Sequence, residues 1–179
     1  MTMNLTESIP CTLRKARVAD GKQIWKLVEE SGTLDVNSAY CYIMLCEYFS
    51  DTCIVAECNR NIIGFVSAIL PPETPETLFV WQITVQDAYR GRGIAETLLQ
   101  KLYDEACREQ VRFMETTITP SNTPSQRLFA KMATAWKSAL VTEEGFSSHL
   151  FPEGAHESEK LIRIGPLCNN KNDRMETVT

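Results

Sequence analysis

Arginine and glycine alternate at Arg90, Gly91, Arg92 and Gly93, directly before a helical apolar periodicity that begins at Ile94. Backbone N–H groups at the start of a helix lack partners, and the helix dipole adds partial positive charge there. Gly93 lets the backbone approach an anion closely because it has no Cβ, and the arginines add cationic donors. The segment therefore predicts a pyrophosphate site, with a solvated turn as the alternative for these four residues alone.

Two common nucleotide-binding motifs are excluded by the residues around this turn. A Walker loop requires Gly-Lys followed by Ser or Thr, and no such sequence follows Gly93. A dinucleotide-binding turn requires the spacing G-x-G-x-x-G, which is absent from the segment. The expected phosphate-bearing ligand therefore belongs to a different class.

Regular elements on both sides would position the turn. Residues 78–85 alternate as a strand, and an apolar stripe at four-residue spacing predicts a helix over 94–107. A strand over 111–117 follows, and then a helix over 124–132 with Thr123 as its N-cap. The turn is thus expected between a strand and a helix, the context in which backbone N–H groups bind phosphate.

The earlier elements follow from capping and turn signals. Asp20 is expected to cap the first helix, with Gln23 completing a capping box. Asn59 and Asn61 are expected to hold positive φ in a hairpin turn. The remaining expected elements are strands at 12–16, 51–58, 62–70 and 161–164 and a helix at 38–49, with no strand between 132 and 161.

Length and charge indicate one globular domain. A chain of 179 residues that is 44% hydrophobic fills a single core, expected over residues 11–167. Residues 1–10 are expected to be a flexible N-terminus and residues 168–179 a disordered polar tail. A net charge of −5 argues against nucleic-acid binding, which requires clustered Lys and Arg.

The cysteines and histidines bear on the expected cellular compartment and on metal binding. The seven cysteines are odd in number and form no C-x-x-C pair, so all are expected to be reduced packing residues. No secretion signal or membrane span is expected, and the protein is predicted to be cytoplasmic. His149 and His156 are the only histidines and lack metal-ligand spacing, so no metal is expected.

The order of residues in the turn carries a family resemblance. The pattern Arg90-x-x-Gly93-x-Ala95, following Thr84-Val85, resembles the cofactor-binding motif of the GNAT superfamily of N-acetyltransferases. The resemblance implies an α/β (α+β) fold with a mixed sheet of about six to seven strands, splayed at the cofactor site, and about four helices. It implies acetyl-CoA as the co-substrate. The cofactor-binding residues that it implies are Ile83, Thr84, Val85, Arg90, Gly91, Arg92, Gly93, Ile94, Ala95, Asn122, Ser125 and Phe129.

Five further blocks narrow the resemblance. They occupy residues 32–42, 78–82, 119–129, 150–159 and 163–167, in that order. Together they resemble the diaminobutyrate-acetylating family of ectoine biosynthesis. That resemblance implies transfer of an acetyl group to the γ-amino group of L-2,4-diaminobutyrate, a homodimer, and a role in making a compatible solute under osmotic stress. A GNAT enzyme acting on another small primary amine is the alternative, and a non-catalytic acetyl-CoA-binding module is a third reading.

Residue roles follow from the chemistry of the implied substrate. Ammonium groups need anionic partners, a carboxylate needs donors, and an attacking amine must lose a proton. A glutamate that some relatives carry falls near Thr77 here, and the tyrosine that many relatives use to protonate the thiolate is Phe129. Tyr40 and Tyr42 are candidate replacements for it. The substrate-binding candidates are Thr33, Asp35, Tyr40, Trp81, His156, Glu157 and Glu159, and the catalytic candidates are Glu157, Glu159, His156 and Tyr40.

Overall fold

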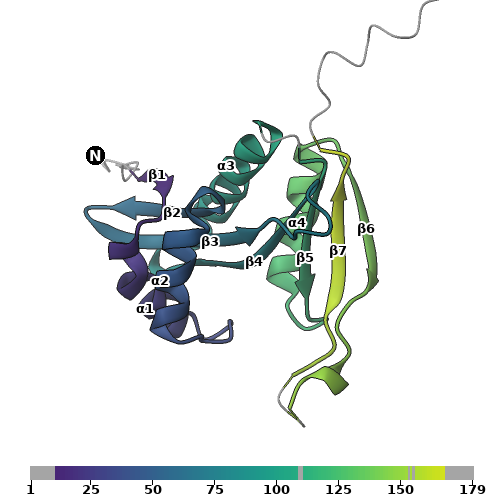
Figure 1. Cartoon of the computed structure of the whole chain (residues 1–179), viewed down its shortest axis with the longest axis horizontal. Helices are drawn as coiled ribbons and strands as arrows, with labels where there is room; N and C mark the ends of the chain where they lie inside the picture. Colours follow the sequence, from purple (N-terminus) through teal and green to yellow (C-terminus); the bar gives the residue numbers. More distant parts are fainter. Residues whose placement is uncertain (1–10, 109–110, 153, 155, 168–179) are drawn as a thin grey trace, which may run out of the picture.

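The computed structural model describes residues 11–108, 111–152, 154 and 156–167. The predictions of a flexible N-terminus at 1–10 and a disordered tail at 168–179 lie outside these residues. The described part contains one seven-stranded mixed sheet in the order β1-β2-β3-β4-β5-β7-β6 (Figure 1). Its strands are β1 (Thr12–Lys15), β2 (Cys53–Cys58), β3 (Asn61–Ile69), β4 (Thr77–Val85), β5 (Phe113–Ile118), β6 (Ala139–Glu144) and β7 (Lys160–Gly165).

Four α-helices cover the two faces of the sheet. Helices α1 (Gly21–Ser31) and α2 (Ala39–Tyr48) share an apolar cluster with one face of β2 and β3. Helices α3 (Ile94–Arg108) and α4 (Thr123–Ala135) pack into a larger cluster on the opposite face. Because β2 and β3 are covered on both faces, they are nearly continuously buried rather than alternating. The predicted mixed sheet and helix number are confirmed.

Strands β4 and β5 stay together only at their amino-terminal ends. They pair in parallel at Thr77 with Phe113, Leu78 with Met114 and Phe79 with Glu115, and no later residues pair. Figure 1 shows the two strands diverging beyond this point. The predicted splay is therefore present, and it leaves unpaired backbone N–H and C=O groups along the edge of β4, where a ligand can take the place of a neighbouring strand.

A β-bulge redirects the middle of β4. Ser67 of β3 pairs with Gln82, but the next residue, Ala68, pairs with Val80, so Trp81 is an extra residue. Bulges occur beside active sites because they re-aim side chains. Here the bulge lies where β4 has already lost β5 as a neighbour.

Two local capping expectations were wrong, because other groups bind the side chains concerned. The Asp20 side chain makes no N-cap bond to α1, and instead accepts from the Arg17 N–H at 2.8 Å and from the Arg14 guanidinium. Gln23 completes no capping box, because its Oε1 accepts from the Ile62 N–H at 3.1 Å. The partner of Gln23 is distant in sequence, and the partners of Asp20 precede the helix, so local capping rules consider neither.

The turn, the last helix and one strand also differ from expectation. Positive φ falls on Asn59 and Arg60 rather than on Asn61. The N-cap of α4 is Asn122, not Thr123, and its side chain accepts from the Ser125 N–H. Strand β6 was not expected, and all of its residues are exposed, so no buried alternation marked it.

The cysteine expectation is wrong at Cys107. Cys107 is disulfide-bonded, so the prediction that all seven cysteines are reduced does not hold. Five others are free thiols: Cys11, Cys41, Cys46, Cys53 and Cys58. Burial raises the pKa of the Cys46 thiol to about 11 and that of Cys53 to about 12, which keeps both protonated at neutral pH.

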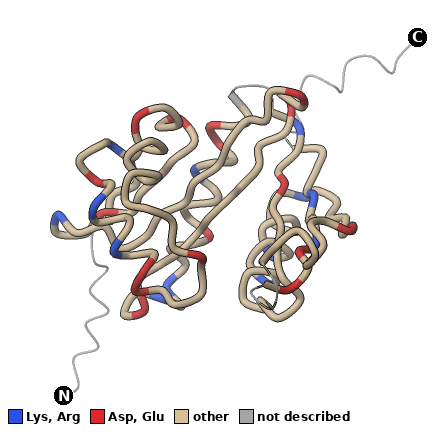
Figure 2. Tube along the Cα trace, turned by 60° about the horizontal axis from the view of Figure 1, so that its bottom comes forward, with Lys and Arg blue, Asp and Glu red and all other residues tan. Residues whose placement is uncertain are grey.

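Charged residues are dispersed over the described chain. Figure 2 shows Lys and Arg interspersed with Asp and Glu along the trace. Such mixing gives no extended basic face of the kind that nucleic acid requires.

We expect Asp20→Asn to lower the free energy of unfolding by about 1–3 kcal/mol at pH 7, because a buried bidentate partner of Arg14 is lost. Burial opposes ionisation of Asp20, yet the bonds from Arg14 and Arg17 outweigh it and lower its pKa below 3.8. A lowered folded-state pKa gives stability that is present above pH 3.8 and lost as pH falls through the folded pKa.

Urea unfolding at pH 7 and near pH 3 measures this effect. The difference between wild type and Asp20→Asn should shrink at the acidic pH. Asp104→Asn is the matched control, because the Asp104 side chain contacts Gln100 on the exposed side of α3. Equal losses for the two variants would contradict the assignment.

Candidate active site

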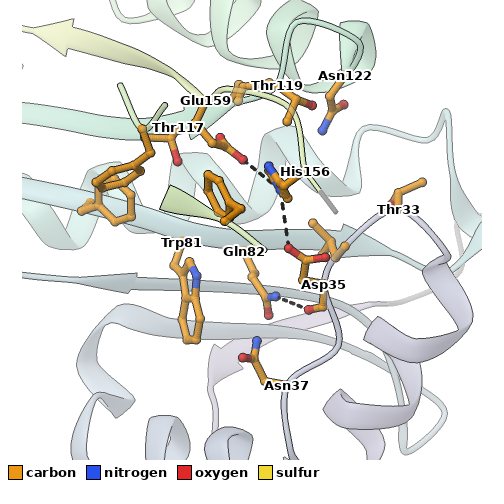
Figure 3. Close-up of a pocket in the computed structure, with 15 residues that line it drawn as sticks. Thr33, Asp35, Asn37, Trp81, Gln82, Thr117, Thr119, Asn122, His156 and Glu159 are labelled. Atoms are coloured by element: carbon orange, nitrogen blue, oxygen red, sulfur yellow. Dashed lines mark hydrogen bonds and ion pairs between the residues drawn. The ribbon is translucent and has the colours of Figure 1, made fainter. Parts of the chain in front are cut away.

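The diverging ends of β4 and β5 open into a cavity of about 400 Å³ (Figure 3). Its walls come from the segment between α1 and α2, from β4, from the β5–α4 connection and from the segment before β7. We call it the acidic–aromatic cavity. It is lined by Thr33, Leu34, Asp35, Asn37, Phe79, Trp81, Gln82, Thr117, Ile118, Thr119, Asn122, Phe146, Phe151, His156 and Glu159.

A second cavity, of about 340 Å³, lies between the end of β4 and the starts of α3 and α4. We call it the loop cavity. Both cavities are lined by Thr33, Leu34 and Asn122, so they meet at these side chains. The other residues that line the loop cavity are Ile83, Thr84, Val85, Arg90, Ala95, Pro124, Ser125 and Leu128.

The glycine turn presents open backbone at the start of α3. Gly91 and Gly93 have φ of +73° and +79°, a region that favours glycine. A Cβ placed on either glycine would meet no heavy atom within 4 Å. The turn therefore combines left-handed backbone with free space in front of it, which fits a phosphate group bound by N–H groups.

The arginines of the turn are held by neighbouring groups. Arg90 donates from Nε to the Val85 carbonyl oxygen at 3.1 Å and lies 3.0 Å from the Asp87 carboxylate. The Arg92 guanidinium lies over the Tyr89 ring, 5.5 Å from its centroid. Arg90 lines the loop cavity, so the cation and the open glycine backbone lie at the same end of β4.

His156 stands between two carboxylates in the acidic–aromatic cavity. Its Nε2 lies 3.6 Å from Oδ2 of Asp35 and 3.5 Å from Oε1 of Glu159 (Figure 3). Its Nδ1 is 2.7 Å from the Glu157 carbonyl oxygen, which only accepts, so Nδ1 carries a hydrogen. The ring also stacks on Phe151 at 4.2 Å, and these contacts fix its orientation.

Glu159 has one carboxylate oxygen without a partner. Its side chain is 15% exposed, and among the described residues Oε2 has no hydrogen-bond partner. A buried carboxylate oxygen is costly without a donor. Because Glu159 lines the cavity, a ligand that carries N–H groups would satisfy it.

Most of the predicted site residues come together. Five of the seven substrate-binding candidates line the acidic–aromatic cavity: Thr33, Asp35, Trp81, His156 and Glu159. Seven cofactor-binding candidates line the loop cavity: Ile83, Thr84, Val85, Arg90, Ala95, Asn122 and Ser125. Four others are not among its lining residues and belong to the adjoining turn and helix start: Gly91, Arg92, Gly93 and Ile94.

Besides these four, three predicted site residues line neither cavity. Tyr40 is 66% exposed on α2, and Phe129 is 2% exposed within the apolar core beneath α4. Glu157 is exposed and accepts a hydrogen bond from the Ser121 hydroxyl. Tyr42, the other candidate for protonating the thiolate, is fully buried, and its hydroxyl contacts Gln82.

Several lining residues were missed. Asn37, Thr117 and Thr119 are polar residues near element ends, which carry no signal by themselves. Phe146 and Phe151 are aromatic residues in a polar stretch, and that contrast could have indicated them. Gln82 was the clearest available signal, because it occupies a buried strand position between Val80 and Thr84.

Within the described residues, no group of three or more His, Cys, Asp or Glu side chains is arranged to hold a metal ion.

None of the described helices is both long enough and apolar enough to span a membrane.

The family of this chain is shown by comparison with known proteins. Residues 22–133 match the acetyltransferase (GNAT) family, and the chain belongs to that family. Its fold and its acetyltransferase class, both expected from the sequence, are thereby confirmed.

Two named relatives indicate which acetyltransferases of the family this chain resembles. The L-2,4-diaminobutyric acid acetyltransferase of Halalkalibacterium halodurans is 48% identical over 87% of this chain and 82% of that protein. The protein of the same name from Streptomyces coelicolor is 43% identical over 86% of this chain and 91% of that protein. The narrower resemblance seen in the five sequence blocks is confirmed.

A solved structure agrees with these relatives. The diaminobutyrate acetyltransferase of Paenibacillus lautus, in complex with its substrate L-2,4-diaminobutyric acid and coenzyme A, is 42% identical to this chain. The two superpose with a TM-score of 0.86 over 91% of this chain and 99% of that one.

We expect Gly93→Val to abolish tight acetyl-CoA binding, because the branched side chain would fill the open space in front of the turn. Any L-residue at φ +79° is also strained, so stability must be measured with affinity. Isothermal titration calorimetry and a thermal melt give the two quantities.

Gly32→Val separates the effect of backbone strain from the effect of filling the space for the cofactor. Gly32 has a φ of +61°, also with open space around its Cβ position, but it ends α1 rather than starting α3. We expect similar destabilisation with acetyl-CoA affinity retained. Equal affinities for the two valine variants would remove the glycine turn from the cofactor site.

Proposed function

We propose that this chain transfers the acetyl group of acetyl-CoA to the γ-amino group of L-2,4-diaminobutyrate, a step of ectoine biosynthesis. The observation that carries the proposal is the meeting of two cavities of opposite character at Thr33, Leu34 and Asn122. One adjoins a cationic glycine turn, and the other contains carboxylates and aromatic rings. The names of the similar proteins from Halalkalibacterium halodurans and Paenibacillus lautus support the same reaction.

Acetyl-CoA fits the loop cavity. The open backbone at Gly91 and Gly93, together with Arg90, would hold the pyrophosphate at the start of α3. The unpaired edge of β4 near Ile83 and Val85 would hold the pantetheine arm by backbone hydrogen bonds. When bound, acetyl-CoA supplies an acetyl group activated as a thioester.

The acidic–aromatic cavity suits a small molecule with two ammonium groups and a carboxylate. Asp35 and Glu159 would accept hydrogen bonds from ammonium groups, and the Trp81 ring offers a face for a cation. Thr33 would donate to the carboxylate, and His156, whose Nδ1 hydrogen is bonded to the Glu157 carbonyl, would donate from Nε2 only in its doubly protonated form. Two anionic groups on opposite sides of His156 favour a substrate that carries more than one cation.

Proton removal falls to the acidic wall of this cavity. A primary amine has a pKa near ~10 and attacks only when neutral, so a group nearby must accept its proton. Glu159 is our candidate, because its Oε2 is buried without a partner among the described residues. Phe129 has no hydroxyl and Tyr42 is fully buried, so neither supplies a proton to the departing thiolate of coenzyme A.

A cytoplasmic homodimer with a role in osmotic stress is part of this proposal. Free thiols at five described cysteines are typical of a reducing compartment, whereas the disulfide at Cys107 is not. Exposed apolar side chains on β6 and the segment after it, at Leu140, Val141 and Leu150, offer surface for a second copy. Ectoine is a compatible solute, which connects the reaction to osmotic stress.

The function is tested by following release of free coenzyme A thiol with purified protein and candidate amines. We expect L-2,4-diaminobutyrate to be used at least tenfold better in kcat/KM than lysine or a polyamine, with mass spectrometry locating the acetyl group on the γ-nitrogen. Preference for another amine would change the proposed substrate but keep the acetyltransferase class. Absence of transfer to every amine, with acetyl-CoA still bound, would favour a binding module.

We expect Asp35→Asn to raise KM for diaminobutyrate about two- to tenfold while KM for acetyl-CoA stays unchanged, because a charge-assisted bond to an ammonium is lost. The effect is moderate because the Asp35 side chain is 85% exposed. Steady-state kinetics with each substrate varied measures it. Asp51→Asn, at a side chain that is 86% exposed and outside both cavities, should leave both KM values unchanged.

A further inference from the structure

A closed ring of hydrogen bonds forms part of the wall of the acidic–aromatic cavity. The Tyr42 hydroxyl donates to Oε1 of Gln82 at 3.2 Å and accepts from the Asn37 backbone N–H at 3.4 Å. Nε2 of Gln82 donates to the Asp35 carbonyl oxygen at 2.9 Å (Figure 3). Because Asp35 and Asn37 are two residues apart, these contacts fasten both ends of one tripeptide to β4 and α2.

The chemistry of the groups fixes the direction of every bond in the ring. The Asp35 carbonyl oxygen only accepts, so it must face the amide nitrogen of Gln82. The amide oxygen then faces Tyr42, and the Asn37 N–H only donates. The tyrosine hydroxyl therefore donates and accepts through a single oxygen, and its removal would break the ring on both sides.

Apolar side chains enclose the inner side of the ring, and its other residues, Asp35, Asn37 and Gln82, line the cavity. Tyr42 is fully buried in the cluster of α1, α2, β2 and β3. Its ring packs edge-on against Phe65, with 6.4 Å between the ring centroids. Gln82 is 5% exposed. A buried polar network is strengthened by low dielectric and is costly when a member is left unpaired. A partly broken ring would therefore be unfavourable, which holds the tripeptide in one position.

We propose that Tyr42 and Gln82 are positioning residues for the amine substrate, because they hold the tripeptide 35–37 at the distance from which Asp35 faces His156 across the cavity. The Asp35 side chain is exposed, and its Oδ2 lies 3.6 Å from Nε2 of His156. This distance is too long for a hydrogen bond that would fix the side chain. The position of its backbone is what the ring determines. This inference rests on the proposed function, since it assigns Asp35 to the ammonium of that substrate.

The first test is Tyr42→Phe, which keeps the aromatic ring in the core and removes only the hydroxyl. We expect KM for diaminobutyrate to rise about two- to tenfold, with KM for acetyl-CoA unchanged. Tyr48→Phe is the matched control, because Tyr48 lies on the same helix but is 69% exposed and lines neither cavity. Equal kinetics for the two variants and wild type would overturn the proposal.

A double-mutant cycle separates positioning from a general loss of stability. If Tyr42 acts through Asp35, then Tyr42→Phe should have little effect in the Asp35→Asn background, so the two losses are not additive. Additive losses, or an equal rise in KM for acetyl-CoA, would show a merely structural role. Gln82→Glu should behave like Tyr42→Phe, because a carboxylate cannot donate to the Asp35 carbonyl.

Hydrogen exchange gives a readout that is independent of activity. In Tyr42→Phe the Asn37 amide should exchange faster, while amides within β2 and β3 stay protected. An unchanged Asn37 rate would overturn the ring whatever the kinetics. If wild type fails to acetylate diaminobutyrate, the proposed function fails, and the exchange result still decides whether the ring holds the tripeptide.

Discussion

The early end of pairing between β4 and β5 is the constraint on which the rest of the site depends. Three residue pairs hold the strands together, and the hydrogen-bonding edge of β4 is then free. A free edge in the middle of a sheet is unfavourable unless something else occupies it. The bulge at Trp81, the glycine turn after β4 and the start of α4 all lie around this opening. The sheet thereby becomes a binding site at its centre, while its outer strands remain ordinary pairs.

The sequence allowed the cofactor half to be predicted more completely than the acceptor half. The strand, turn and helix around Arg90 and Gly93 are contiguous, so local rules describe them. The acceptor cavity is assembled from four separate segments, and contacts such as Asp35 with His156 join residues 121 positions apart by their numbers. Local capping rules failed at Gln23 for the same reason, because its partner Ile62 is distant in sequence. Asp20 is bonded instead by Arg14 and Arg17, which precede its helix. Phe129 was misplaced because it lies on the core side of α4, a position that motif spacing does not indicate.

The two cavities impose different requirements on the residues between them. Backbone N–H groups and Arg90 favour a phosphate-bearing ligand, whereas Asp35 and Glu159 favour cations. Opposite charges in adjoining spaces discriminate between the ligands, since each cavity repels the ligand of the other. Asn122 belongs to both walls and also caps α4, so the start of that helix is fixed at the junction.

The acceptor wall needs a rigid support that the exposed segment 33–37 does not have by itself. Such a segment would normally be mobile, since few of its side chains are buried. Substrate binding would then include the entropic cost of ordering it. The hydrogen bonds of Tyr42 and Gln82 order this segment when the protein folds, because the polar groups are satisfied only when the tripeptide lies against β4. The entropic cost is therefore part of folding and not of substrate binding. The Asp35 side chain can therefore stay exposed to its ligand while hydrogen bonds from Gln82 and to Tyr42 hold the backbone of residues 35–37.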